Sequence, residues 1–237
     1  MSVYLSRAYL ASEEQLNSIE IKELGKSEAE ELILKNPYIL PHLKKKRVIA
    51  YPEFLNFASN SFKARSIVLV NTVKPSKLSL ILFEYYDVAE PLSMGGYTLR
   101  EIMSSSIYKE FVGRAYRKII AYIERIDLCR SKAEWVIKLR NWINDNVKKI
   151  DRETLCKESY VNEVTLVFRD LNIGTESLVR YLDDELDIRV FGSEIKKMTV
   201  DSKTIYIVRS YIPPYKHRMS EEEREMWLKA MYNPYAE

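Results

Sequence analysis

Residues 66–86, SIVLVNTVKPSKLSLILFEYY, hold two β-branched, aliphatic and aromatic runs on either side of a short polar segment. The segment Lys74-Pro75-Ser76-Lys77 fits a four-residue turn, because proline presets one turn dihedral. Both runs are nearly continuous in apolar residues, which indicates strands that are buried on both faces. We therefore predict an antiparallel hairpin in a sheet that has helices on each side.

Helical patterns flank this hairpin. Apolar residues recur at three- and four-residue steps in three segments, which predicts amphipathic helices at 28–40, 99–126 and 133–147. Ser27 is the predicted cap of the first helix, Pro37 its predicted end, and Lys118 lies on the predicted polar face of the second. Short strands are expected at 48–51 and 54–57. The predicted fold class is α/β or α+β, with a sheet of three or more strands flanked by helices.

The C-terminal part predicts a different module. Residues 160–171 and 176–186 have helical patterns around a turn at Gly174, and two strand candidates follow at 188–191 and 204–209. Helix, turn, helix and β-ribbon is the order of a winged helix, so we predict a small winged-helix-like α+β domain. The predicted organisation is an α/β domain at 1–130, a helical connector at 131–150, the winged-helix-like domain at 151–212 and a tail helix at 213–237.

Composition narrows the setting of the protein. With 237 residues, 46% hydrophobic and 30% charged, the chain reads as a folded protein of one or two domains. Its longest apolar runs are near five residues and its N-terminus lacks an apolar signal core, so we expect a cytoplasmic protein with no membrane span. Two Cys and two His argue against a disulfide framework and a structural zinc site. Six Gly, one Gln and many ionic side chains suggest a thermophilic source.

The charge is distributed unevenly along the chain. Residues 1–150 hold 24 Lys and Arg against 17 Asp and Glu, a balance of +7, whereas residues 151–237 hold 13 against 17, a balance of −4. This asymmetry suggests that the two parts meet different partners. The basic candidates for nucleic-acid binding are Lys44, Lys45, Lys46, Arg47, Lys63, Arg65, Lys196 and Lys197. Residues 151–210 hold 9 basic and 12 acidic side chains, which favours a protein partner over DNA there. The candidates for binding a protein partner are the acidic residues Asp183, Asp184, Glu185 and Asp187.

Residues 25–126 resemble the core of the PD-(D/E)XK, or restriction-endonuclease-like, superfamily in layout. An acidic helix ends at Asn36-Pro37, a strand pair follows, and then a helix rich in Arg and Tyr. In that superfamily an opening helix precedes an antiparallel β-meander, and a helix packs behind it. The resemblance implies an Asp at the start of the second strand and a Glu-x-Lys on the third, which converge on Mg²⁺ for phosphodiester hydrolysis.

The sequence contains only part of the set of residues that this chemistry requires. The second strand, around 64–68, has no carboxylate. Glu84 stands at the Glu position of the third strand, but Tyr86 replaces the lysine, and Asp87 should point to the opposite face from Tyr86. We therefore predict a nuclease-like scaffold without catalytic residues, with Glu84 as the residual candidate. No cofactor is expected, and Mg²⁺ would bind only if the chain were a nuclease.

The combined layout resembles the archaeal TBP-interacting proteins, which implies binding to the TATA-binding protein. The preferred hypothesis is a non-enzymatic regulatory protein that binds a component of the transcription or DNA-processing machinery, with a homodimer as a further expectation. A direct DNA-binding protein that uses the basic N-terminal part is the first alternative. A Mg²⁺-dependent nuclease that combines Glu84 with Glu28 and Glu31 is the second. A viral or plasmid accessory role fits each hypothesis.

Overall fold

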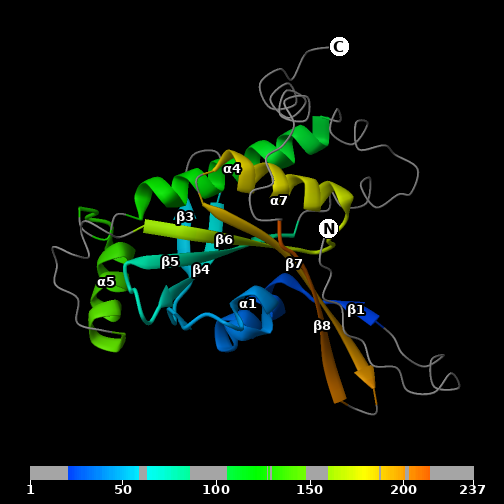
Figure 1. Ribbon diagram of the computed structural model, residues 1–237, viewed down its shortest axis with the longest axis horizontal. Coiled ribbons are helices and arrows are strands. Elements are labelled where there is room, and N and C mark those ends of the chain that lie inside the picture. Colours follow the sequence, from blue (N-terminus) through cyan, green and yellow to red (C-terminus); the bar gives the residue numbers. More distant parts are fainter. Residues whose placement is uncertain are drawn as a thin grey trace, which may run out of the picture.

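The computed structural model describes residues 21–58, 63–85, 106–126, 128, 130–147, 160–186, 188–200 and 203–213. These residues form a mixed sheet with helices on both faces (Figure 1). The elements in chain order are β1 (Ile21–Glu23), α1 (Lys26–Lys35), the short 3-10 helices η2 (Pro37–Ile39) and η3 (Pro41–Leu43), β2 (Val48–Ala50), β3 (Leu55–Ala58), β4 (Lys63–Asn71), β5 (Lys77–Glu84), α4 (Ser106–Arg125), α5 (Glu134–Asn146), β6 (Tyr160–Phe168), α7 (Ile173–Glu185), β7 (Arg189–Val200) and β8 (Lys203–Tyr211).

The strand order is β1-β7-β6-β5-β4-β2, with β3 also paired to β4 and β8 also paired to β7. The predicted hairpin is confirmed, because β4 and β5 pair antiparallel from Ser66 with Leu82 to Val70 with Leu78. Strands β5, β6 and β7 are parallel to one another. Parallel neighbours require crossover connections. Helix α4 lies in the connection from β5 to β6, and α7 lies in the connection from β6 to β7.

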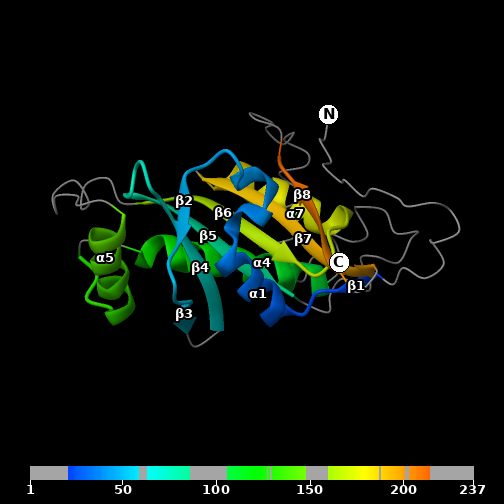
Figure 2. The ribbon, with the colours of Figure 1, turned by 90° about the horizontal axis from the view of Figure 1, so that it is seen from below.

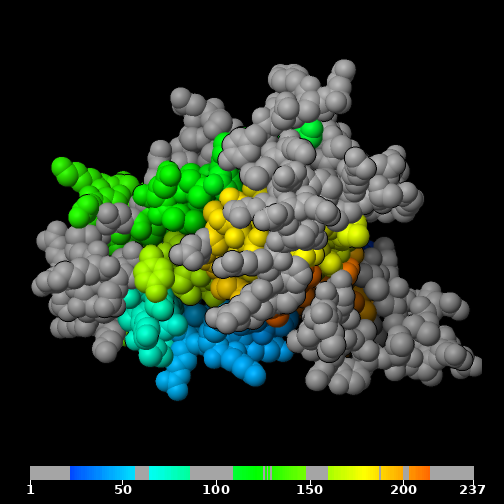
Figure 3. Space-filling model, turned by 45° about the horizontal axis from the view of Figure 1, so that its top comes forward, coloured from blue at the N-terminus to red at the C-terminus, as the bar shows by residue number. Residues whose placement is uncertain are grey.

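Two hydrophobic cores lie on opposite faces of the sheet. One contains buried residues of α4, α5 and α7, and Figure 3 shows α4 and α7 side by side on that face. The other contains residues of α1 and of the stretch 37–43, which holds η2 and η3 and is called the 3-10 segment; these elements cover the opposite face in Figure 2. Strand β5 supplies both cores in alternation, with Leu80 and Leu82 on the α4 face and Ile81 and Phe83 on the α1 face. The fold is therefore of the α+β class, with one sheet that helices cover on both faces.

Helix α7 lies very close to β7 at Gly192. A Cβ atom at this position would lie 3.0 Å from a Val179 methyl carbon and 3.2 Å from a Leu171 methyl carbon. The helix begins at a capping box in which the Asn172 side chain accepts hydrogen bonds from the backbone of Gly174 and Thr175. A glycine in the strand and a well-capped helix start together fix how α7 packs on the sheet.

The predicted helix at 160–171 is wrong, because residues 160–168 form β6. Val161, Val164, Thr165 and Val167 are β-branched, and such side chains fit a pleated strand better than a helix. All residues of β6 from Glu163 onward are buried, between β5 on one side and β7 on the other. The expected helix-turn-helix is therefore not formed, and strands from both predicted parts of the chain join in one sheet.

The other predicted elements that fall on described residues are confirmed with shifted bounds. The helices at 28–40, 99–126, 133–147 and 176–186 correspond to α1, α4, α5 and α7, and the predicted ribbon corresponds to β7 and β8, which pair antiparallel. Helix α1 begins after Gly25 rather than Ser27. The predicted tail helix lies outside the described residues, as does the first part of the 99–126 segment. None of the described helices combines the length and apolarity needed to span a membrane.

Candidate functional site

Glu84, the residual catalytic candidate, lies at the end of β5 and is only 3% exposed. Its two carboxylate oxygens accept hydrogen bonds from Lys118 Nζ of α4, at 2.8 and 2.9 Å. Burial raises the pKa of Glu84 above its ordinary value, and the Lys118 ammonium opposes that rise. The pair is a buried ion pair across the interface between the sheet and α4.

The surroundings of Glu84 do not fit a divalent cation. An ammonium group is already bound to both of its oxygens. Lys26 and Arg114 add further positive charge that acts on the same carboxylate. Mg²⁺ prefers several oxygen ligands, and cationic neighbours disfavour it electrostatically. No catalytic step through a metal follows from this arrangement.

The acids of the opening helix do not join Glu84. Glu28 accepts hydrogen bonds from Lys197 Nζ of β7, at 3.0 and 2.7 Å. Glu31 is exposed and lies 3.5 Å from Lys35 Nζ of its own helix. Helix α1 covers the face of the sheet opposite to α4, whereas Glu84 contacts α4. The carboxylate set of the nuclease alternative is therefore not brought together.

Sequence reasoning missed Lys118 as the partner of Glu84. The sequence places Lys118 beside three arginines of α4, which suggested a polar face, but the residue is only 7% exposed. It lies in the buried stripe of Phe111, Ala115 and Tyr122, at three- and four-residue spacing. A lysine inside an apolar stripe is the signal for a buried acidic partner.

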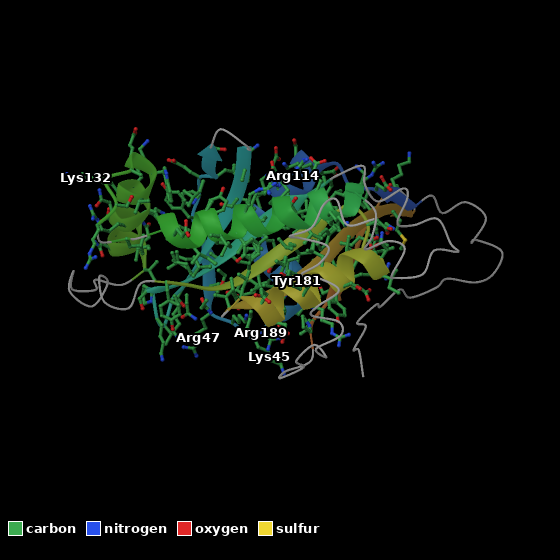
Figure 4. The ribbon with its side chains drawn as sticks, turned by 90° about the horizontal axis from the view of Figure 1, so that it is seen from above. Lys45, Arg47, Arg114, Lys132, Tyr181 and Arg189 are labelled. Atoms are coloured by element: carbon green, nitrogen blue, oxygen red, sulfur yellow. The ribbon has the colours of Figure 1, made fainter. Side chains whose placement is uncertain are left out.

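Most of the predicted nucleic-acid-binding residues with described side chains are neutralised by acids. The ion pairs are Lys46 with Glu163, Arg65 with Glu30, Lys196 with Glu194, and Lys197 with Glu28. The side chain of Lys63 lies outside the described residues. Lys44, Lys45 and Arg47 are exposed and form no ion pair with another residue that the structure describes. In Figure 4, Lys45 and Arg47 lie on one long side of the molecule, far from Lys132 beside α5.

A groove of about 700 Å³ lies between the 3-10 segment and β8. It is lined by Tyr38, Ile39, Pro41, His42, Lys44, Lys45, Tyr206 and Val208. This set of lining residues contains two lysines and no acid. Tyr38 and Tyr206 are among the exposed large hydrophobic residues, at 40% and 37%. The groove therefore combines exposed aromatic rings with positive charge, and sequence reasoning identified only its lysines.

The base of the groove is held by polar contacts to β6. His42 Nε2 and Thr165 Oγ1 are 2.9 Å apart, and the His42 ring stacks on Phe191 with 4.4 Å between centroids. Burial, together with the charge of Lys46, lowers the pKa of His42 to about 3. The imidazole is therefore neutral near pH 7, and the positive charge at the groove comes from lysine.

Part of the predicted acidic patch, which consists of Asp183, Asp184, Glu185 and Asp187, has a structural role. Asp183 accepts hydrogen bonds from Arg189 Nε at 3.0 Å and from the backbone N–H of Val190 at 2.7 Å. Burial raises the pKa of Asp183, against the opposing effect of these two donors. Asp184 and Glu185 are half-buried, and Asp187 lies outside the described residues. Asp183 thus fastens the start of β7 to α7 and is not a free acid for a partner.

Replacing Asp183 with alanine is expected to lower the free energy of unfolding by about 1.5–3 kcal/mol, because two hydrogen bonds to an ionised group are lost. Urea denaturation measures the change. Asp145→Ala is the matched control, since Asp145 is an exposed acid of α5. Equal stability of the Asp183 variant and the unmodified protein would contradict the structural role given to this carboxylate.

Comparison of the chain with protein-family models, curated proteins and solved structures finds no match.

Proposed function

We propose that this chain is a non-enzymatic nucleic-acid-binding protein that acts in transcription or another DNA-associated process. The observation that carries the proposal is the position of Lys44, Lys45 and Arg47. All three cations are exposed and have no acidic partner among the described residues, and Lys44 and Lys45 line a groove whose described lining contains no acid. Lysine and arginine that are free to contact phosphates release counterions and supply affinity.

The arrangement around Glu84 supports a binding role over catalysis. The element order of α1, the antiparallel strands β2 to β5 and then α4 is in keeping with the resemblance to a nuclease-like scaffold. Both carboxylate oxygens of Glu84 accept hydrogen bonds from Lys118, so this carboxylate is bound within the protein and is not available to hold a metal ion. A protein partner from the transcription machinery, including the TATA-binding protein, and a homodimer both stay predictions.

The proposal is tested by the salt dependence of binding to duplex DNA. The unmodified protein is expected to bind a labelled duplex with an affinity that falls steeply between about 50 and 200 mM salt. The double variant Lys44→Ala, Lys45→Ala is expected to reduce the slope of log affinity against log salt by roughly 1.8, which is about 0.9 for each lost phosphate contact. Fluorescence anisotropy measures both quantities.

Lys132→Ala is the matched control, since Lys132 is exposed at the other end of the molecule (Figure 4). It should leave the slope unchanged. Absence of DNA binding at low salt, or an equal loss in the Lys132 variant, would contradict the proposal. Cleavage of the same DNA in the presence of Mg²⁺ or Mn²⁺ would contradict its non-enzymatic part.

A further inference from the structure

We infer that the groove between the 3-10 segment and β8 binds single-stranded nucleic acid, with bases stacked on Tyr38 and Tyr206 and phosphates held by Lys44 and Lys45. This inference rests on the proposed function and names the class of ligand. A volume of about 700 Å³ is in the range of sites that enclose small organic groups, for which about 300–1,000 Å³ is usual.

The two tyrosines come from different elements, and the ring of Tyr38 is held in place by a hydrogen bond. Tyr38 lies in η2, and its hydroxyl donates a hydrogen bond to the Val48 carbonyl oxygen at 2.8 Å. Because the hydroxyl is anchored on β2 while the residue is 40% exposed, Tyr38 is held as a fixed aromatic surface beside the groove. A ring that is already ordered loses little conformational entropy when a base stacks on it.

Tyr206 lies on β8, which pairs only with β7 among the described strands. Its cross-strand partner is Lys197, whose side chain reaches Glu28 of α1. Directly paired residues of an antiparallel ladder point to the same face. Tyr206 therefore projects from the sheet on the face that carries α1 and η3, where it lines the groove.

The charge of the groove favours a polyanion. Lys44 and Lys45 line it, and its described lining contains no carboxylate. Glu163, a buried acid of β6, is already paired with Lys46 of the neighbouring basic stretch. Aromatic rings beside unpaired lysines are the combination that tracks single strands, because every base has a face for stacking and every nucleotide has a phosphate. Bases within a duplex are stacked on one another, so a duplex cannot use the rings in this way.

The test compares Tyr206→Ala with the unmodified chain by fluorescence anisotropy, using labelled oligo(dT) and oligo(U) of about 15 nucleotides and a duplex of equal length. Tyr206→Ala is expected to weaken single-strand binding by roughly 5- to 150-fold and duplex binding by much less, in line with the usual contribution of one stacked base. Tyr206→Phe should retain binding, because the stacking face remains.

Tyr160→Ala is the matched control, because Tyr160 is also an exposed tyrosine on a strand and lies outside the groove lining. The Tyr206 side chain makes no hydrogen bond to another described residue, so its removal should leave the melting temperature unchanged. Thermal unfolding of each variant checks this.

The outcomes separate this inference from the proposed function. If Tyr206→Ala leaves single-strand binding unchanged while the Lys44 and Lys45 variant still loses affinity, the stacking site is rejected and the proposed function stands. If the unmodified protein binds neither single strands nor duplex at low salt, both are rejected. Displacement of the oligonucleotide by poly-glutamate, with the same dependence on Tyr206, would also overturn the inference, because the ligand would then be an acidic peptide.

Discussion

Replacing Lys118 with methionine is expected to lower the free energy of unfolding by about 3–5 kcal/mol. Methionine keeps an unbranched apolar side chain in the buried stripe of α4, so packing is largely preserved. The Glu84 carboxylate, 3% exposed, would lose the ammonium that now binds both of its oxygens. Leaving one buried charge without its partner is what makes the loss large. Urea denaturation monitored by circular dichroism measures it.

The same variant should also change how stability depends on pH. Burial raises the pKa of Glu84 and Lys118 opposes that rise, so the variant has a still higher pKa for this carboxyl in the folded protein. Between the ordinary pKa of a glutamate, about 4.3, and the raised folded value, the folded protein binds more protons than the unfolded chain. Its stability therefore increases as the pH falls through this window. We expect Lys118→Met to recover part of its lost stability on moving from about pH 8 to pH 5.5.

Two further variants control this prediction. Lys138→Met removes an exposed lysine that pairs with Glu134 of the same helix at 2.9 Å, and it should leave the denaturation midpoint unchanged. Combining Lys118→Met with Glu84→Leu removes both charges and should restore most of the stability, because no unpaired charge remains in the core. If the double variant is as unstable as Lys118→Met alone, the loss comes from packing and not from the stranded carboxylate.

The elements that sequence reasoning predicted well are those whose local pattern agrees with their tertiary environment. Strands β4 and β5 are runs of β-branched and aliphatic residues on either side of a Pro-containing turn, and they form the predicted hairpin. Strand β6 was predicted as a helix because its apolar residues also match a helical spacing over a short window. Its neighbour β5 is about 80 residues away along the chain and its neighbour β7 follows α7, and burial between these two strands is information that a local pattern does not contain.

The candidate site shows a similar division. The sequence identifies the basic stretch at 44–47, and two of its exposed members, Lys44 and Lys45, do line a groove. It does not reveal that Lys46 differs from its neighbours, because the difference arises from an acid on β6, more than a hundred residues away. Tyr38 and Tyr206 also come from opposite ends of the described chain. Which residues distant in sequence come together depends on the order of the strands in the sheet. This order could not be derived from the sequence, because β6 was predicted as a helix.

Replacing Lys46 is expected to lower the free energy of unfolding, whereas replacing the neighbouring Lys44 is expected to affect nucleic-acid binding and not stability. Lys46 Nζ forms an ion pair with Glu163, which is 3% exposed and also accepts a hydrogen bond from Ser79 Oγ at 2.5 Å. The Lys46 side chain is 33% exposed, so solvent screens the pair in part. Lys46→Met is therefore expected to cost roughly 1–3 kcal/mol, whereas Lys44→Met should change the stability by less than about 0.5 kcal/mol.

Adding Glu163→Gln to Lys46→Met distinguishes a stranded charge from lost packing. Glutamine is neutral and still accepts the hydrogen bond from Ser79, so the double variant should regain most of the lost stability. Because Lys46 fastens the segment that carries His42, Lys44 and Lys45 to β6, Lys46→Met should also weaken single-strand binding, and the added Glu163→Gln should restore it only in part. Equal stability of the Lys44 and Lys46 variants would contradict the structural role given to Lys46. Both residues would then be ordinary surface lysines, and the ion pair with Glu163 would not hold residues 42–45 on β6.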